Sequence, residues 1–160
     1  FAAMKNIKRP KLYFEMIDRD FLQLSRKWLE NETFCGLIMA EPVEQNIQEA
    51  WFTSLPDKKN YQIWGLKTSQ WVGACGLKNI DKDRRMAEYW GYIYPVELRG
   101  VGLGREMFHF LVKQATDSGI DRLWLRVGEK NNTARISYQS WGFTTIESDD
   151  PKVVYMEFSL

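Results

Sequence analysis

Three glycines at alternate positions, Gly100, Gly102 and Gly104, separate a strand-like segment from a helix-like one. Residues 86–94 are rich in aromatic side chains and end at a proline, whereas apolar residues recur at helical spacing after the glycines. Glycine allows left-handed backbone and close approach of a ligand, and the first turn of a helix offers free N–H groups. The junction therefore predicts a loop that binds a pyrophosphate, with Arg99 as an additional cation. The alternative is a sharp turn without a ligand.

The glycine spacing does not match the two commonest nucleotide-binding loops. A Walker A loop ends in Gly-Lys-Ser/Thr, and this loop does not. A dinucleotide-binding loop has the spacing G-x-G-x-x-G followed by an acidic residue about 20 positions on, whereas Asp121 here begins the next predicted strand. Neither P-loop nucleotide chemistry nor a dinucleotide cofactor is therefore expected.

The remaining periodicities predict one domain over residues 4–160. A strand–helix–strand passage lies among strands that are otherwise linked as hairpins, which is typical of a mixed sheet. We expect an α/β (α+β) fold with a mixed, mostly antiparallel central sheet of about seven strands, four helices on its two faces, and the order β-α-α-β-β-β-α-β-α-β-β. Strands are expected at 12–17, 61–66, 71–77, 86–94, 123–127, 143–146 and 153–158, and helices after Asp18, over 43–55, from the glycine loop to Ser118, and from Asn131 or Asn132 to Trp141.

Composition excludes several classes of function. The 160 residues carry a net charge of +1, so neither nucleic acid nor a membrane surface is expected as a partner. No apolar run approaches the roughly 20 residues needed to cross a bilayer, and the expected location is the cytoplasm. Cys35 and Cys75 lie far apart and His109 is the only histidine, which argues against a metal site or a disulfide scaffold. Residues 1–3 precede Met4 and are interpreted as a vector remnant.

Two motifs resemble those of one enzyme superfamily. Arg99-x-x-Gly102-x-Gly104 is similar to the (Q/R)-x-x-G-x-G/A signature of the GNAT superfamily of N-acetyltransferases. About 30 residues later, Asn131-x-x-Ala134-x-x-x-Tyr138-x-x-x-Gly142-Phe143 resembles the N-x-x-A-x-x-x-Y-x-x-x-G-F element of the same superfamily. The resemblance is close over residues 86–143. It implies a GNAT fold and direct transfer of an acetyl group from acetyl-CoA, as co-substrate, to a primary amine.

The resemblance also implies which residues bind the cofactor. Main-chain N–H groups of the glycine loop would hold the pyrophosphate of coenzyme A, and the preceding strand would contact the pantetheine arm. A main-chain N–H within a residue or two of Tyr92 would polarise the thioester carbonyl. The cofactor-binding residues implied are Ile93, Tyr94, Val96, Arg99, Gly100, Val101, Gly102, Leu103, Gly104, Asn131, Ala134 and Tyr138, and no metal is implied.

Two side chains are candidates for acid–base catalysis. Tyr138 lies where the superfamily has its general acid. A phenol suits this role, because with a pKa of about 10 it is protonated at pH 7 and can protonate a leaving thiolate. The alternative is a helix residue that packs on the sheet. Glu88 lies where many relatives carry the carboxylate that deprotonates the amine, and it shares a strand face with Trp90. Its alternative is a solvated or ion-paired glutamate near Arg84 or Arg85.

The acceptor is the least determined part of the function. The pattern formed by Trp28, Asn31 and Trp51 resembles the subgroup of ribosomal-protein N-terminal and nucleotide-amino-sugar acetyltransferases, and Trp90 and Tyr92 are expected to join them in binding the acceptor. A small-molecule amine is preferred, with a nucleotide-linked amino sugar first and a protein N-terminus second. A polyamine is a further alternative, for which the three glutamates within residues 41–49 are suggestive. A non-catalytic acyl-CoA-binding module is the alternative from another class, and a homodimer is possible.

Two reactive side chains are expected to be structural. His109 recurs with Arg105 and Lys113 on the polar face of its helix and is expected to face solvent. Cys75 lies in the middle of a strand and is expected to be a small core residue. Direct acetyl transfer does not require a nucleophilic thiol.

Overall fold

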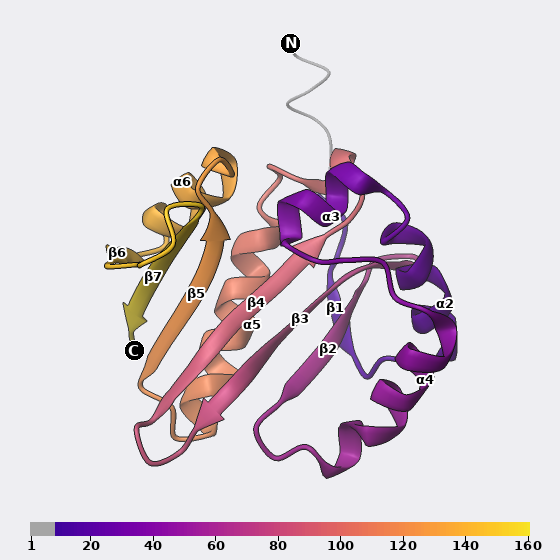
Figure 1. Ribbon diagram of the computed structural model, residues 1–160, viewed down its shortest axis with the longest axis horizontal. Coiled ribbons are helices and arrows are strands. Elements are labelled where there is room, and N and C mark those ends of the chain that lie inside the picture. Colours follow the sequence, from indigo (N-terminus) through magenta and orange to yellow (C-terminus); the bar gives the residue numbers. More distant parts are fainter. Residues whose placement is uncertain (1–8) are drawn as a thin grey trace.

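The computed structural model describes residues 9–160, so the segment 1–3 interpreted as a vector remnant lies outside the described residues. Residues 9–160 form a seven-stranded sheet in the order β1-β2-β3-β4-β5-β7-β6 (Figure 1). Neighbouring strands are antiparallel except β4 and β5, which are parallel. The strands are β1 (Tyr13–Glu15), β2 (Gln62–Lys67), β3 (Trp71–Asp81), β4 (Met86–Ile93), β5 (Arg122–Gly128), β6 (Thr144–Ile146) and β7 (Val153–Ser159).

Helices cover both faces of this sheet (Figure 1). The three N-terminal helices lie over one face, and α5 crosses the other face behind β3 and β4. The predicted fold class is confirmed. The α-helices of the described residues are α2 (Arg19–Trp28), α3 (Glu32–Ile38), α4 (Gln45–Ser54), α5 (Leu103–Asp117) and α6 (Asn132–Ser140), with single 3₁₀ turns η1 (Leu55–Asp57) and η2 (Val96–Leu98).

The helix α3 was not predicted, so the described residues contain five α-helices instead of four. Its seven residues are too few to show a clear helical period, and Gly36 lies in its middle. A side-chain cap helps to form it, because the Asn31 Oδ1 atom accepts a hydrogen bond of 3.0 Å from the main-chain N–H of Phe34. Met39 then ends the helix in the left-handed region, at φ 54°.

Two apolar clusters lie on the two faces of the sheet. Under α5 and α6, residues such as Tyr89, Leu103 and Met156 are almost fully buried. Under the N-terminal helices, Phe21 and Trp28 pack against the start of β3. Burying one such side chain contributes roughly 1.5–3 kcal/mol, so the two clusters hold the helices firmly on the sheet.

The central strands β4 and β5 diverge after a short paired stretch. β4 pairs with β3 from Lys78↔Glu88 to Gly73↔Ile93, but with β5 only from Met86↔Arg122 to Glu88↔Trp124. We call the gap beyond this last pair the fork. The N–H of Tyr94 donates to the Val72 carbonyl of β3, at 2.8 Å. Because strand main-chain groups alternate in direction, those of residues 89, 91 and 93 face the fork.

Candidate active site

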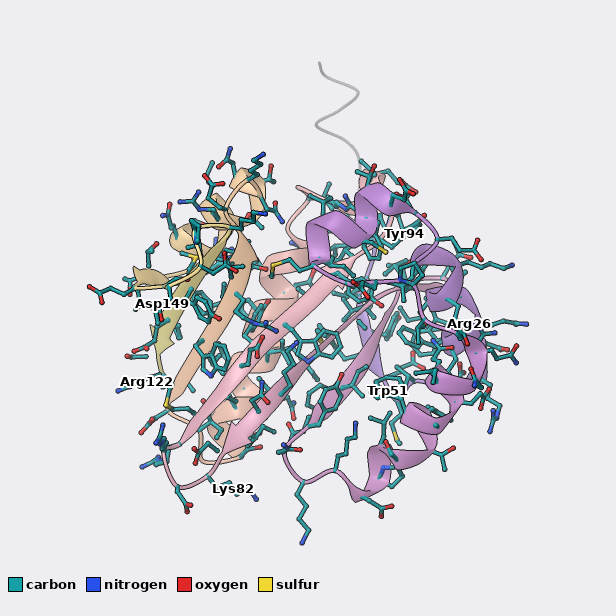
Figure 2. All side chains as sticks on the ribbon, viewed as in Figure 1. Arg26, Trp51, Lys82, Tyr94, Arg122 and Asp149 are labelled. Atoms are coloured by element: carbon teal, nitrogen blue, oxygen red, sulfur yellow. The ribbon has the colours of Figure 1, made fainter. Side chains whose placement is uncertain are left out.

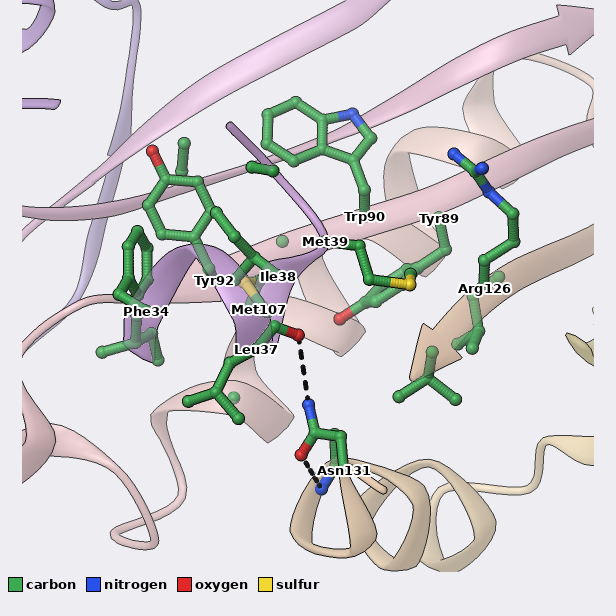
Figure 3. Close-up of a pocket in the computed structure, with 18 of the residues that line it drawn as sticks. Phe34, Leu37, Ile38, Met39, Tyr89, Trp90, Tyr92, Met107, Arg126 and Asn131 are labelled. Carbon is green, nitrogen blue, oxygen red and sulfur yellow. Dashed lines mark hydrogen bonds between the residues drawn. The ribbon is translucent and has the colours of Figure 1, made fainter. Parts of the chain in front are cut away.

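A cavity of about 1110 Å³ runs along the fork (Figure 3). Its lining comes from the glycine loop at one end, from α3 and α4 at the other, and from β4, β5 and α6 between them. We call these two ends the loop end and the acceptor end. The cavity exists because the two central strands β4 and β5 diverge and leave a gap between them. Both sequence motifs and several aromatic residues therefore meet in a single space.

The loop end is built from main chain. Gly100 and Gly102 have φ angles of 75° and 95°, in the region that favours glycine. Gly102 is also the N-cap of α5, and no side chain caps this helix. The first N–H groups of α5 therefore have no intrahelical partner and can donate hydrogen bonds to an anion. No atom lies within 4 Å of a Cβ built at Gly100, so the loop leaves room for a diphosphate.

Arg99, predicted as an additional cation for the pyrophosphate, also makes two hydrogen bonds within the protein. Its Nε–H donates to the carbonyl of Ile93 at 2.9 Å, and its Nη2 donates to the carbonyl of Tyr94 at 2.6 Å. The main-chain groups of Tyr94 are thus both engaged within the protein, by Val72 and by Arg99. Arg99 still lines the cavity, but two of its donors hold the loop against the end of β4.

Two cations near the loop were missed by sequence reasoning. The Arg9 Nη1 atom lies 2.6 Å from a Cβ built at Gly102, and its Nε lies 3.4 Å from the Glu106 carboxylate. Arg105 lines the cavity from the first turn of α5. Arg9 is distant from the loop in sequence and carries no motif, so only the fold brings it there. Arg105 was assigned to the solvent face, and it is exposed as expected.

Tyr138 lies in the middle of the cavity, on α6. Its ring packs at 6.1 Å from the ring of Tyr89 and at 5.5 Å from that of Trp141. Burial raises the pKa of Tyr138 to about 12, so the phenol is protonated at neutral pH and can donate a proton. Ala134 lines the same wall, one turn before it.

Asn131 connects the two walls of the cavity. Its Oδ1 atom caps α6 by accepting from the N–H of Ala134 at 3.4 Å, as predicted for a helix cap. Its Nδ2 atom donates to the carbonyl of Leu37 in α3, also at 3.4 Å (Figure 3). The start of α6 and the end of α3 are therefore linked across the cavity.

Glu88 is buried and held by three partners. Only 3% of the residue is exposed. One carboxylate oxygen accepts from Asn79 Nδ2 at 2.9 Å, and the other accepts from Arg126 Nε at 3.2 Å and lies 3.6 Å from Lys78 Nζ. The predicted alternative of an ion pair is correct in kind but wrong in its partners, since Arg84 pairs with Asp81 and Arg85 with Asp121. The partners come instead from the strands on either side of β4.

The acceptor end is built from aromatic and apolar side chains. The ring of Tyr61 lies 6.3 Å from Trp51 and 6.1 Å from Trp90, and all three line the cavity with Tyr92. Figure 2 shows Trp51 between α4 and the sheet. Tyr61 was not predicted as a site residue. The apolar lining at this end includes Leu37, Ile38, Met39, Val43 and Ile47.

Two residues expected at the acceptor end lie elsewhere. Trp28 is buried and packs against the rings of Tyr92 and Tyr94, at 6.0 and 5.3 Å. Asn31 caps α3. Neither residue is among those that line the cavity.

The remaining predicted residues lie at the edges of the site or outside it. The side chain of Val96 is exposed in η2, that of Val101 is exposed in the loop, and that of Leu103 is buried under α5. His109 faces solvent and Cys75 is fully buried, as predicted. Within residues 9–160, no group of three or more His, Cys, Asp or Glu side chains is placed to hold a metal ion. None of the helices described is long and apolar enough to cross a membrane.

The fold thus brings the glycine loop, the phenol of Tyr138 and the carboxylate of Glu88 to one cavity. The family model described as "Acetyltransferase (GNAT) family" matches residues 22–143, and the chain belongs to this family. It is accordingly an N-acetyltransferase that uses acetyl-CoA as its co-substrate. No curated protein matches the chain in sequence.

Solved structures resemble the whole described fold. A spermidine N-acetyltransferase from Vibrio cholerae, solved with CoA and spermine, has a TM-score of 0.80 at 18% identity, over 92% of this chain and 95% of that one. A domain from Methanocaldococcus jannaschii gives 0.80 at 20% identity, over 94% and 99%. An acetyltransferase from Thermus thermophilus gives 0.76 at 18% identity, over 96% and 100%. At these identities the likeness establishes the fold.

Proposed function

We propose that the chain acetylates the primary amine of a small molecule that also carries an aromatic or sugar ring and an anionic group, such as a nucleotide-linked amino sugar. The charge of the cavity carries this proposal. Its charged lining residues are Glu88 and four cations, Lys78, Arg99, Arg105 and Arg126. Arg99 and Arg105 lie at the loop end and suit the phosphates of the cofactor. Lys78 and Arg126 lie beside Glu88 and suit an anion on the acceptor.

A polyamine is the second candidate, because the Vibrio cholerae neighbour is a spermidine N-acetyltransferase solved with spermine. The acceptor end does not favour it. A polyamine carries several positive charges, and the one carboxylate among the described lining residues, Glu88, already pairs with two cations. The glutamates of residues 41–49 do not line the cavity, and one of them, Glu49, pairs with Arg19. A peptide N-terminus, the other alternative, brings no feature that matches the two cations.

The aromatic wall suits the ring of the proposed acceptor. Trp51, Tyr61 and Trp90 present large flat surfaces that are held by packing against one another. Aromatic side chains bind sugar and base rings through apolar contact and stacking. The partly open side chains of Lys78 and Arg126, 32% and 42% exposed, then offer charged hydrogen bonds to an anion at the edge of the same space.

The two proton transfers of the reaction are assigned to opposite faces of the fork. The bound thioester supplies the activated acetyl group. On the acceptor face, Glu88 retains free lone pairs after its present contacts and can accept the amine proton, directly or through a water molecule. The main-chain N–H groups of Gly91 and Ile93 face the gap and are placed to stabilise a developing oxyanion, one residue on either side of the predicted Tyr92. On the opposite face, Tyr138 delivers a proton to the sulfur.

The test is a thiol-release assay with purified protein and acetyl-CoA. The acceptors compared are nucleotide-linked amino sugars, the free amino sugars, spermidine, aminoglycosides and peptides with free N-termini. We expect the highest kcat/KM for a nucleotide-linked amino sugar. A higher value for spermidine would replace the proposal with the polyamine alternative. Binding of acetyl-CoA without release by any amine would support the non-catalytic module.

A pair of matched variants tests the role of the anion. Arg126→Gln removes a cavity cation from β5 and is expected to raise the KM of the anionic acceptor about tenfold, the effect of a charged hydrogen bond. The control is Arg122→Gln, which removes an arginine from the same strand that lies at its far end, away from Trp51 (Figure 2). Equal KM values in the two variants would contradict an anion site beside Glu88.

A further inference from the structure

The hydroxyl of Tyr89 is a buried polar group without a partner. Tyr89 is 2% exposed, and its oxygen has no hydrogen-bond partner among the described residues. Its ring is fixed on several sides by the rings of Tyr138, Phe108 and Phe143. The side chain lines the cavity, and Figure 3 shows its hydroxyl directed into the space beside Met39. The hydroxyl is therefore held rigidly and aimed at the place where a ligand would lie.

A buried hydroxyl without a partner lowers stability, whereas a phenylalanine would fill the same volume without this cost. The packing of Tyr89 would be equally satisfied by the unsubstituted ring, since its contacts are with other aromatic rings. Within the described residues, the hydroxyl thus serves no visible purpose in folding. Its orientation towards the cavity points to a partner that arrives from outside the chain.

The position of Tyr89 narrows down what this partner is. It is the first residue of β4 beyond the last β4–β5 pair, Glu88↔Trp124, and so lies at the inner end of the fork. The glycine loop lies at one end of the cavity and the acceptor wall at the other. A cofactor that is anchored at the loop and presents its acyl group to an amine near Glu88 must place the reacting end beside residues 88 and 89. Tyr138, on the same side as Tyr89, marks the same point.

We infer that the Tyr89 hydroxyl donates a hydrogen bond to the thioester end of bound acetyl-CoA, as a second phenol beside Tyr138. This inference rests on the proposed function. In the transfer, the amine nitrogen forms a bond to the carbonyl carbon and loses a proton to Glu88, the carbon–sulfur bond breaks, and the sulfur takes a proton from Tyr138. Tyr89 keeps its proton and stabilises the charge that develops. Burial, together with the nearby Tyr138, raises the pKa of Tyr89 well above its ordinary value, which agrees with a donor that is not itself ionised.

The test compares Tyr89→Phe with wild type in calorimetric titrations of two ligands. One ligand is acetyl-CoA, and the other is desulfo-CoA, which has the same phosphates and arm but no sulfur or acetyl group. We expect Tyr89→Phe to bind acetyl-CoA about fivefold to tenfold more weakly and to bind desulfo-CoA within twofold of wild type. We also expect kcat to fall at least tenfold, and the ligand-free variant to unfold at the same urea concentration as wild type or a higher one. Tyr13→Phe, which removes a tyrosine hydroxyl from β1, is the control.

Each outcome decides the inference. A lower unfolding midpoint of ligand-free Tyr89→Phe would show that the hydroxyl stabilises the fold, and would overturn it. Equal loss of affinity for the two ligands would place the contact on another part of the cofactor, and would also overturn it. Unchanged affinities and unchanged kcat would do the same while leaving the proposed function intact. If wild type itself failed to bind acetyl-CoA, the proposed function would fail together with this inference.

Discussion

The two ends of the cavity are built from different materials. At the loop end, the binding groups are main-chain N–H groups, presented by two glycines in left-handed backbone and by the uncapped start of α5. At the acceptor end, the lining groups are side chains from the α3–α4 region, β3, β4 and β5, together with Tyr61 just before β2. A main-chain cradle tolerates many side chains around it, whereas a wall of side chains depends on each of them.

This difference separates cofactor binding, which does not depend on particular side chains, from acceptor binding, which does. Under the proposed function, the loop end binds the cofactor through main-chain groups, which do not depend on the identity of the side chains around them. The acceptor end changes with every substitution in its wall, and the acceptor can change with it. Predictions that act on one end and leave the other intact therefore test the division directly.

The largest effect is expected from Gly102→Glu at the loop end. A side chain here is strained by a φ of 95° and meets Arg9 at 2.6 Å, and its negative charge repels a diphosphate. Acetyl-CoA binding, measured by calorimetry, should weaken more than a hundredfold. The control Gly119→Ala shares the left-handed backbone, with a φ of 78° and open space around it, and should lose about 1 kcal/mol of stability while binding normally. Normal binding by Gly102→Glu would mean that the cradle is misplaced.

Tyr138→Phe acts between the two ends and should affect neither binding step. Loss of a general acid typically lowers the rate by about a hundredfold or more, so kcat should fall to that extent while the affinity for acetyl-CoA stays within twofold. Because the pKa of Tyr138 is about 12, the phenol stays protonated up to about pH 10. Titration of this group should therefore produce no decrease in the wild-type rate below that pH. An undiminished kcat in Tyr138→Phe would reduce the residue to a packing role.

Glu88→Gln tests the acceptor side of the fork. The substitution keeps the shape of the side chain but removes the charge that faces Lys78 and Arg126. We expect kcat at neutral pH to fall about tenfold to a hundredfold, and to recover as rising pH deprotonates the free amine without help. The pH–rate profile measures this, with Glu157→Gln as a control that breaks the ion pair with Arg122. A parallel fall at all pH values would assign Glu88 to structure alone.

Trp51→Ala should weaken the acceptor end and leave the loop end unchanged. Removal of one stacking ring costs about 1–3 kcal/mol, so the KM of the acceptor should rise about tenfold at constant acetyl-CoA affinity. Phe52→Ala is the matched control, since Phe52 follows on the same helix and packs beneath the Arg19 guanidinium instead of lining the cavity. Equal effects of the two substitutions would indicate a general loss of α4 packing.

The smallest effect concerns stability at high pH. The pKa of Tyr138 in the folded chain is about 12, above the value of about 10 in an unfolded chain. The resulting contribution to the free energy of unfolding is fully present below about pH 10 and is lost as the pH approaches 12. Urea unfolding at about pH 9 and about pH 11 should therefore show wild type losing more stability than Tyr138→Phe. An equal loss in both proteins would mean that burial of Tyr138 does not restrict its ionisation.

The sequence predicted the main-chain part of the site better than the side-chain part. The glycine loop, the cap at Asn131 and the position of Tyr138 follow from residues close together in the chain, whose spacing has a local meaning. The partners of Glu88 do not, because Lys78 and Arg126 reach it from neighbouring strands, and the pairing of strands cannot be read from one segment. The position of Arg9 beside the loop could not be predicted either, because Arg9 is distant from the loop in sequence.

Two assignments at the acceptor end differ from the structure. Trp28 and Asn31 were expected there from a resemblance to one subgroup of acetyltransferases, whereas α3 was not predicted, because a seven-residue helix gives almost no periodic signal. With α3 in place, Trp28 becomes a core residue and Asn31 a helix cap, whereas Leu37 and Met39 take up positions on the wall. Tyr61 and Tyr89 carried no motif, and only their neighbours in space show their relation to the cavity.

The short pairing of β4 with β5 also has a mechanical consequence. Three residue pairs join the β1–β4 half of the sheet to the β5–β7 half, fewer than β4 makes with β3 or β5 with β7. A cofactor lying in the fork would form hydrogen bonds with both strands where they do not pair with each other, and would so connect the two halves of the sheet. Occupancy and stiffness would then rise together, and amide hydrogen exchange at Gly91, Ile93 and Val127 should slow most when the protein is loaded.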